Sequence, residues 1–263
     1  FERASYMKLC RGENERTILD RHDKSYFDAG GEGELQTFFG ELLGHLGTIG
    51  DRGLISLPTG NHDLPRYSVG RSEAELKAVL TFQLCLPAIP TIYYGDEIGL
   101  AAPGDLPSKE GAYRRTQART PMIWEDGPQA AFSPAAPESF YLPAFPDARA
   151  NAAAQEAAED SIFHHLRRLV ELRRRHPALG VRGHFKQLNP PGAPYPVVFL
   201  REWAGERFVV AVNALARPAG VTLPEGFRVA RHLIGEAHPQ QEEPNCFELP
   251  AFGSVVWELS PQT

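Results

Sequence analysis

Two short apolar runs with a helical pattern between them predict a strand, a helix and a second strand over residues 54–95. The first run covers residues 54–58 and the second covers residues 89–94, and each ends in a turn that contains glycine. Between the runs, Ser72 and Glu75 have the spacing of a helix capping box, and apolar residues follow at helical intervals, at Leu76, Val79, Leu80 and Leu84. Because one crossover joins the strands, we expect them to be parallel, with their carboxyl ends at the same edge.

Two further amphipathic helices are predicted, one on each side of this unit. Apolar residues recur at helical spacing over residues 35–46 and stop at the glycines of residues 47–50, so we expect this helix to pack outside the first strand. The other helix begins with Asp160 or Ser161 as its cap and ends before Pro177.

The hydrophobic pattern changes twice along the rest of the chain. Residues 101–160 contain many Pro, Ala and Gly residues and little periodicity, which predicts a long functional loop that shapes a pocket. From residue 181 onward, short β-like runs separated by Pro- and Gly-containing turns predict an antiparallel sandwich. We therefore expect two domains, residues 1–180 and residues 181–263.

Composition narrows the classes of partner. The chain has 263 residues and a net charge of −6, and its basic clusters are arginines on a predicted helix, so neither nucleic acid nor a membrane is an expected partner. No apolar run reaches the roughly 20 residues of a membrane span. Three cysteines without paired spacing predict neither a disulfide framework nor a cysteine metal site, and a reducing cytoplasm is the expected location. We expect no cofactor and no metal; the sequence contains no Asp-rich loop for calcium, although it does not decide calcium dependence.

Polar side chains follow both predicted strands. Asn61, His62 and Asp63 come directly after the first strand, and Asp96 and Glu97 come after the second. In parallel α/β enzymes the carboxyl ends of strands carry the catalytic groups. The triplet taken alone is open to a second interpretation, because Asn and Asp are also common turn residues that bond to local amides.

Three ordered motifs resemble those of the α-amylase family of retaining glycoside hydrolases. They are Thr-Gly-Asn-His-Asp-Leu-Pro-Arg at residues 59–66, Ile-Pro-Thr-Ile-Tyr-Tyr-Gly-Asp-Glu-Ile-Gly at residues 89–99, and Arg-Thr-Pro-Met-Ile-Trp at residues 119–124. Residues 107–113, 151–155 and 169–179 extend the resemblance toward the α-glucosidase and trehalose-synthase-like branch. The resemblance implies an α/β fold, in which the last part of a (β/α)₈ TIM barrel is followed by an antiparallel β-sandwich.

The resemblance also assigns roles to the triplet and to two arginines. It implies an enzyme that acts on the α-glucosidic bonds of oligosaccharides or disaccharides, with Asp63 as the carboxylate that stabilises the transition state. His62 and Asn61 are the expected sugar-binding residues. Arg66 and Arg119 are expected to contact substrate, although Arg66 has the alternative interpretation of a plain surface arginine.

A second set of residues is expected to support the pocket from behind. Tyr94, Asp96 and Glu97 end the second strand, and Asp96 is a candidate either for binding a distal sugar or for a structural hydrogen bond.

The sequence departs from the family pattern in the two groups that carry out the reaction. Neither the nucleophile motif nor the acid/base glutamate is found, and Glu2, the one early glutamate to consider, has no strand before it. The chain also opens without Met, in a region that resembles the part after the sixth barrel strand. We therefore expect a carboxyl-terminal portion of an enzyme that is inactive alone and needs the missing barrel half. The alternatives are a transglycosylase or trehalose-synthase-like isomerase, and a non-catalytic, barrel-derived interaction protein.

Overall fold

The structure is a computed structural model that describes residues 26–27, 35–63, 66–103, 106, 116–189, 193, 195–240 and 243–262. Its helices are α2 (Leu35–Ile49), α3 (Glu73–Leu84), α4 (Ala152–Ala157) and α5 (Ile162–Arg175). Its strands are β1 (Ser56–Pro58), β2 (Ile89–Thr91), β3 (His184–Gln187), β4 (Val197–Trp203), β5 (Glu206–Val212), β6 (Ala219–Thr222), β7 (Phe227–Ile234), β8 (His238–Gln240), β9 (Glu243–Leu249) and β10 (Ser254–Pro261). No helix within these ranges is both long and apolar enough for a membrane span.

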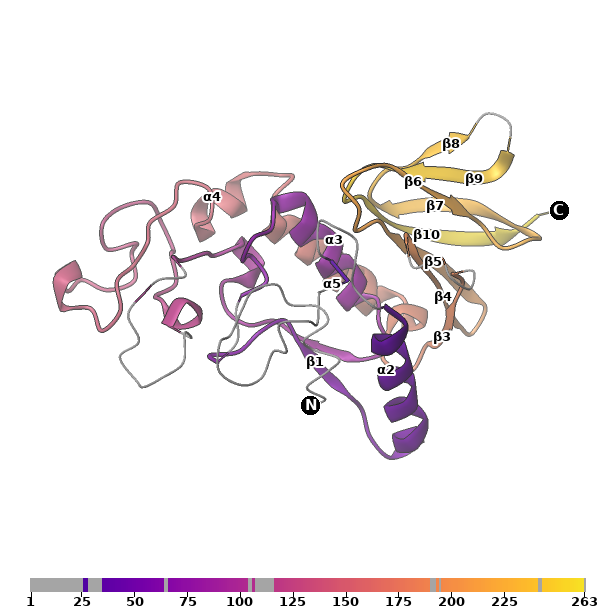
Figure 1. Ribbon diagram of the computed structural model, residues 1–263, viewed down its shortest axis with the longest axis horizontal. Helices are drawn as coiled ribbons and strands as arrows, with labels where there is room; N and C mark the ends of the chain where they lie inside the picture. Colours follow the sequence, from indigo (N-terminus) through magenta and orange to yellow (C-terminus); the bar gives the residue numbers. More distant parts are fainter. Residues whose placement is uncertain are drawn as a thin grey trace.

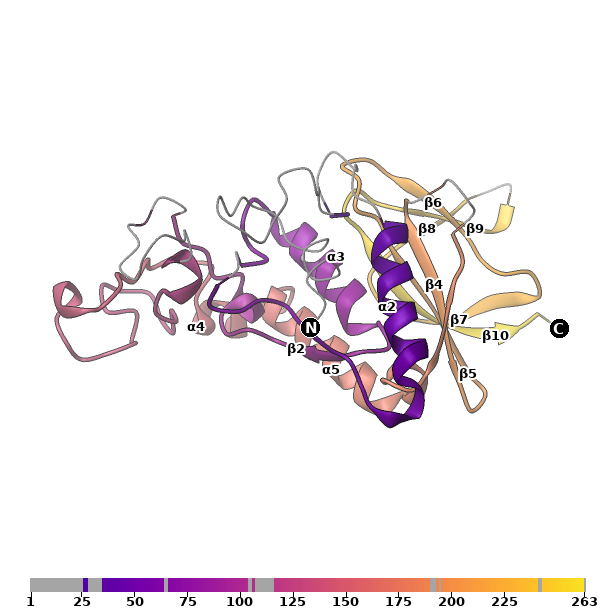
Figure 2. The same ribbon diagram turned by 60° about the horizontal axis from the view of Figure 1, so that its bottom comes forward.

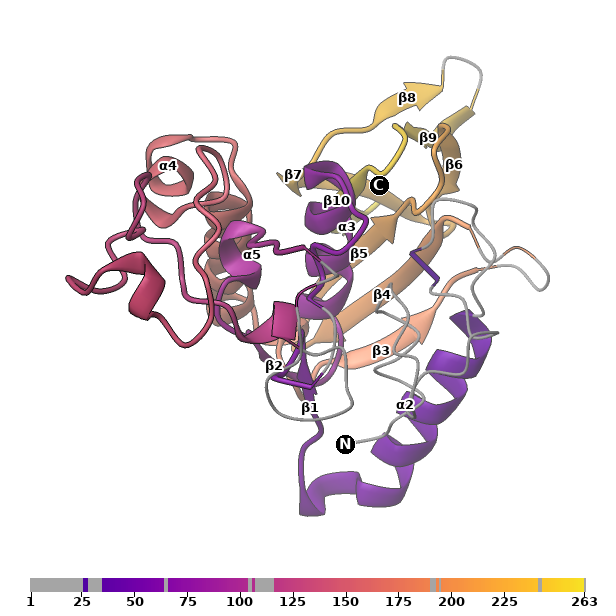
Figure 3. The ribbon, with the colours of Figure 1, turned by 60° about the vertical axis from the view of Figure 1, so that its left-hand side comes forward.

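The predicted strand, helix and strand are confirmed. β1 and β2 pair in parallel, and α3 is the crossover between them (Figure 3). Glu75 donates its backbone N–H to the Ser72 hydroxyl at 3.3 Å and accepts from the Ser72 N–H at 2.7 Å, which completes the capping box. Both strands are shorter than predicted, at three residues each. Within the described residues the parallel sheet contains these two strands and is not a closed barrel.

The two amphipathic helices also form where the pattern places them. The N-cap of α5 is Ser161, whose hydroxyl accepts from the His164 N–H at 3.2 Å, so Ser161 rather than Asp160 is the cap. Figures 1 and 2 show the long loop of residues 116–150 and the β sheets at opposite ends of the molecule, with α3 and α5 between them. The loop therefore extends away from the sheets, beyond the carboxyl ends of β1 and β2.

The carboxyl-terminal strands form two antiparallel sheets. The larger has the order β3-β4-β5-β10-β7, and the smaller has the order β6-β9-β8. Apolar side chains on the facing sides of the two sheets form one buried cluster, which includes Val209 and Trp257 from the larger sheet and Phe247 and Leu249 from the smaller. The antiparallel, two-sheet arrangement predicted from residue 181 onward is thus present.

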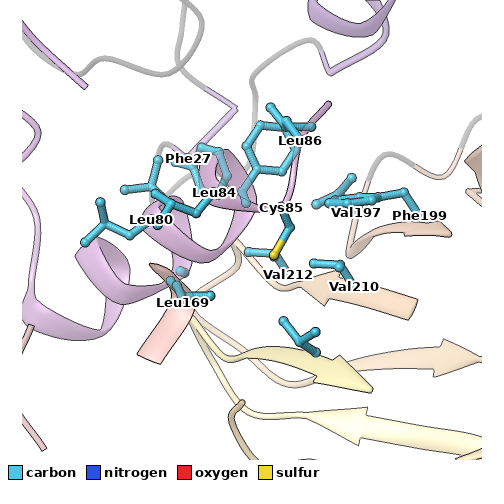
Figure 4. Close-up of a cluster of buried hydrophobic side chains, with 14 of the residues drawn as sticks. Phe27, Leu80, Leu84, Cys85, Leu86, Leu169, Val197, Phe199, Val210 and Val212 are labelled. Atoms are coloured by element: carbon cyan, nitrogen blue, oxygen red, sulfur yellow. The ribbon is translucent and has the colours of Figure 1, made fainter. Parts of the chain in front are cut away.

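The three middle strands of the larger sheet, β4, β5 and β10, are largely buried on both faces. Along β4, Val198 and Leu200 face the small sheet, whereas Val197 and Phe199 pack with the helices. The helix side of the sheet joins one large core with α2, α3 and α5, shown in part in Figure 4. Because strand side chains alternate between faces, apolar runs without alternation are the mark of a strand covered on both sides. The proposed boundary at residue 180 stays a prediction, since this core extends across it.

Two arginines, one from the large sheet and one from α5, donate to backbone carbonyls around the carboxyl end of α3. Arg201 of β4 is fully buried and donates to the carbonyls of Cys85, Gly180 and Gly183, with the Gly180 bond at 2.5 Å and the Gly183 bond at 3.2 Å. Arg173 of α5 donates to the carbonyls of Leu84, Leu86, Ala88 and Leu179. Both guanidiniums thus meet the carbonyl-rich carboxyl end of α3, where the helix dipole favours positive charge. Burial lowers the pKa of Arg201 to about 10.

A buried histidine links α5, α3 and β10. Nε2 of His165 lies 2.8 Å from the Thr81 hydroxyl and 3.1 Å from the Lys77 carbonyl, and Ser254 donates to the Thr81 hydroxyl at 3.0 Å. Burial, together with the positive charges of Arg168 and Lys77, lowers the pKa of His165 to about 4, against the opposing effects of the hydrogen bond to the Lys77 carbonyl and the charge of Asp160. His165 therefore stays neutral in the folded protein well below the pH at which it is protonated in the unfolded chain.

We expect the protein to lose stability between pH 6.5 and pH 4 because of His165. In that window the unfolded chain binds a proton that the folded protein does not, so the free energy of unfolding falls as the pH falls, by on the order of 3 kcal/mol in total. Urea unfolding at pH 7 and pH 4.5 should show a smaller loss in His165→Gln than in the wild type. His164→Gln controls for removal of an imidazole from the same helix. Parallel pH profiles of the wild type and His165→Gln would contradict this expectation.

Candidate active site

The turn after β1 holds Asp63 in a defined position. The backbone N–H of Asp63 donates to Oδ1 of Asn61 at 2.8 Å, which closes a local turn. Nε2 of His62 lies 3.3 Å from Oδ2 of Asp63, and the His62 side chain is largely exposed, whereas that of Asp63 is 37% exposed. The turn interpretation of the triplet is thus confirmed for Asn61, and the catalytic interpretation of Asp63 and His62 stays a prediction.

Arg119 connects the long loop to this turn through two hydrogen bonds. Its Nη2 donates to Oδ1 of Asp63 at 2.9 Å, and its Nε donates to the carbonyl of His62 at 2.8 Å. Arg119 is the last residue of the short 3₁₀ helix Thr116–Arg119, which lies in the long loop after β2. A charge-assisted bond of this kind fixes one carboxylate oxygen and leaves the other toward His62.

Arg66 lies inside the protein, behind the turn. Its side chain is 1% exposed, and its guanidinium donates to the carbonyls of Tyr94 and Ala118, the latter at 3.2 Å. The same group lies 4.5 Å from the ring centroid of Tyr94 and 5.2 Å from that of Tyr93. The interpretation of Arg66 as a plain surface arginine is wrong, because the residue is buried. Its contacts join the β1 turn, the β2 turn and the long loop.

Asp96 forms the second link between the two strand ends. Its Oδ2 accepts from the Thr59 hydroxyl at 2.6 Å, and the Tyr93 backbone N–H donates to that same hydroxyl oxygen at 2.9 Å. Asp96 is 2% exposed. Burial raises the pKa of Asp96 to about 6, against the opposing effects of the Thr59 bond and the Arg66 charge. The geometry is that of a structural hydrogen bond rather than of contact with a distal sugar.

The remaining predicted residues lie around these two networks. The Tyr94 ring is 38% exposed, and its hydroxyl donates to the Thr120 carbonyl at 2.7 Å. Glu97 is partly buried, and its Oε2 has no hydrogen-bond partner among the described residues. Glu2 lies outside the described residues.

The structure brings several of the predicted residues into contact and adds connections that the sequence did not predict. Asn61, His62, Asp63 and Arg119 form one connected cluster, with Asp96 and Arg66 in the layer behind it. Thr59 and Tyr93, which join the two layers, are not among the predicted site residues. Asp96 is the residue that points to them, because a buried carboxylate needs a hydrogen-bond donor nearby. Within the described part of the chain, no group of three His, Cys, Asp or Glu residues is placed to hold a metal.

Comparison with known proteins shows which family the chain resembles. The alpha amylase catalytic domain matches residues 36–181, which is more than half of the chain. The trehalose synthase/amylase TreS of Mycobacterium tuberculosis is 35% identical over 160 residues, covering 58% of this chain and 25% of that protein. The palatinase of Erwinia rhapontici is 29% identical over 247 residues, covering 79% of this chain and 43% of that protein.

Solved structures agree with the sequence relatives. The trehalulose synthase MutB from Pseudomonas mesoacidophila MX-45 is 26% identical and superposes with a TM-score of 0.72 over 85% of this chain and 46% of that one. Other structures of MutB contain sucrose, isomaltulose or glucose. The chain thus spans between about a quarter and a half of the length of these relatives. It belongs to the α-amylase family.

Proposed function

We propose that this chain is the carboxyl-terminal part of a retaining enzyme that acts on α-glucosidic bonds, and that Asp63 stabilises its transition state. The observation that carries the proposal is the Asp63, His62 and Arg119 cluster at the carboxyl end of a parallel strand. An ionised carboxylate in this place interacts more strongly with the substrate as positive charge develops on the sugar ring.

Each residue of the cluster has a separate task in this mechanism. Asp63 accepts hydrogen bonds from sugar hydroxyls, and these bonds strengthen as the ring approaches an oxocarbenium ion. Arg119 keeps the carboxylate from rotating by holding Oδ1, and Asn61 fixes the backbone beneath it. His62, whose ring is exposed beside Oδ2, is placed to bond to a sugar hydroxyl.

The nucleophile and the acid/base are proposed to come from residues outside this chain. Retaining hydrolysis requires two carboxyl groups about 5–5.5 Å apart. Asp96, the buried carboxylate behind the turn, is bonded to Thr59 and is therefore not available as either of these groups. The relatives, which extend beyond this chain by more than half of their length, have room for both groups.

A covalent label tests whether the nucleophile lies outside this chain. A fluorinated glucosyl fluoride that accumulates the glycosyl-enzyme should inactivate the whole protein, and mass spectrometry of its peptides should place the label outside residues 1–263. The intermediate should accumulate because the ring fluorine slows both its formation and its hydrolysis, whereas the good fluoride leaving group speeds only its formation. Time-dependent inactivation without any label, or a label on a residue of this chain, would overturn the proposal.

Hydrolysis and isomerisation are both open to such an enzyme, because water and a sugar hydroxyl compete for the same glycosyl-enzyme. The similarity to a trehalose synthase and to trehalulose synthase structures favours isomerisation as the second candidate. Product analysis separates the two: free glucose from maltose or sucrose indicates hydrolysis, whereas a rearranged disaccharide indicates isomerisation.

A further inference from the structure

A buried hydroxyl holds the start of the turn that carries Asp63. The Thr59 side chain is fully buried, and its hydroxyl donates to Oδ2 of Asp96 at 2.6 Å while it accepts from the Tyr93 N–H at 2.9 Å. The Thr59 N–H donates to the Thr91 carbonyl at 2.9 Å. Thr59 is therefore held through its side chain and through its backbone by β2 and the turn that follows β2.

Asp96 also lies against the backbone of the next residue in the turn after β1. Gly60 has no side chain, and a β-carbon at this position would lie 3.3 Å from Oδ2 of Asp96 and 3.5 Å from the Tyr93 side chain. Gly60 directly precedes Asn61, whose side chain accepts from the Asp63 N–H. A change in the position or charge of the Asp96 carboxylate therefore acts on the stretch of backbone that presents Asp63.

A second buried charge reaches Asp63 by another route. Arg66 donates to the Ala118 carbonyl at 3.2 Å, and Ala118 directly precedes Arg119, which bonds to Asp63. The same Arg119 lines a cavity of about 470 Å³ in the long loop. The positive charge of Arg66 also favours the ionised form of Asp96. The two buried charges thus support one carboxylate, Asp96 through the turn and Arg66 through the long loop.

We propose that Asp96 in its ionised form is a positioning residue for Asp63: it fixes Thr59 at the base of the turn, and its protonation loosens the turn and slows the reaction. The inference rests on the proposed function, because it concerns the carboxylate that stabilises the transition state. A neutral carboxyl accepts the Thr59 hydrogen bond more weakly than a carboxylate does, and it no longer balances the buried charge of Arg66. Misplacing a reacting group by about 1 Å costs on the order of 100-fold in rate.

The surroundings of Asp96 set the pH at which this loosening occurs. Burial raises the pKa of Asp96 to about 6, and the nearby charge of Glu97 acts in the same direction. The Thr59 bond and the Arg66 charge oppose this shift. Tyr93, which also faces Asp96, stays protonated because burial raises its pKa to about 12. Asp96 therefore gains a proton as the pH falls through about 6, and kcat of the wild type should decline between pH 7 and pH 5.

The first test changes the hydroxyl that Asp96 holds, in the whole protein, and measures kcat, KM and the unfolding midpoint on whichever of maltose or sucrose the wild type turns over. Thr59→Val keeps the shape of the side chain without the hydroxyl and should lower kcat by about 10–100-fold at pH 7, with less than about a threefold change in KM. Thr59→Ser keeps the hydroxyl and should retain most of the wild-type kcat. Thr91→Val is the matched control, because its hydroxyl bonds to Ser56 at 2.9 Å on the exposed side of the same strand pair, and it should behave as the wild type.

The second test removes the charge of Asp96. Asp96→Asn keeps nearly the same shape but cannot ionise, so its kcat should be low already at pH 7 and should lack the decline between pH 7 and pH 5. A purely structural Asp96 would change the unfolding midpoint but leave the pH profile of the folded variant like that of the wild type.

Three results would overturn the inference and leave the proposed function intact: equal kcat in Thr59→Val and Thr59→Ser, losses of the same size in Thr59→Val and Thr91→Val, or a wild-type pH profile in Asp96→Asn. If Asp96→Asn does not fold, the three threonine variants still decide. Wild-type turnover in the Asp63→Asn protein refutes the proposed function itself.

Discussion

Replacing Asp63 with Asn should lower kcat/KM of the whole enzyme on maltose or sucrose by on the order of 10³-fold. The amide keeps the size of the side chain and one oxygen for Arg119, but it removes the negative charge that faces the developing cation. Because that charge acts mainly in the transition state, kcat and kcat/KM should fall together, with a much smaller change in KM. Steady-state kinetics on both sugars measures the changes in kcat and in KM separately.

Asp51→Asn is the matched control for this substitution. Asp51 is also an aspartate paired with an arginine, Arg182, at 3.1 Å, but its side chain is fully exposed. It precedes β1, whereas Asp63 follows it, so the two carboxylates lie beyond opposite ends of the strand. Asp51→Asn should leave the kinetics unchanged. Wild-type turnover in Asp63→Asn would remove Asp63 from the mechanism.

Replacing Arg201 with Met should destabilise the protein by about 3–5 kcal/mol, the largest effect we expect on stability. Methionine fills much of the space but leaves the buried carbonyls of Cys85, Gly180 and Gly183 without their donor. These carbonyls join the end of α3 and the chain before β3 to the middle of the large sheet. Chemical denaturation of the wild type and the variant under the same conditions measures the loss.

Arg207→Met on the neighbouring strand separates this effect from the general loss of an arginine. Arg207 is paired with Glu202 at 2.7 Å, and both side chains are more than one third exposed. An exposed pair of this kind contributes about 0–1 kcal/mol. Equal destabilisation by Arg201→Met and Arg207→Met would show that the carbonyl contacts of Arg201 contribute little.

Local patterns predicted those parts of the fold whose causes are local. The capping box at Ser72 and Glu75 formed as predicted, and so did the helix ends near Gly50 and before Pro177. These features depend on residues three or four positions apart, which the sequence displays directly. The strand ends were less well predicted, because a strand ends where its partner stops pairing with it, and the partner of β1 lies more than 30 residues away.

In the candidate site, too, the sequence shows which residues are present, but the fold decides where they lie. The sequence contains the triplet at residues 61–63 and both arginines, but it does not show where the arginine side chains lie. Arg66 and Arg119 look equally available for substrate, yet Arg66 is buried among backbone carbonyls while Arg119 reaches Asp63 across 56 positions of the chain. Only the path of the long loop decides which arginine faces the carboxylate.

The sequence by itself determined the family resemblance, the parallel strand pair, the amphipathic helices and the position of the Asn61–Asp63 triplet at the end of the first strand. Each of these follows from short-range periodicity or from a contiguous motif. The tertiary structure alone decided that α2, α3 and α5 cover one side of the large sheet, that Arg201 of β4 and Arg173 of α5 both donate to carbonyls around the end of α3, and that a cavity opens beside Arg119. These features come from side chains far apart in the chain, and their energies depend on burial and on donor geometry that exist only after the layers have packed.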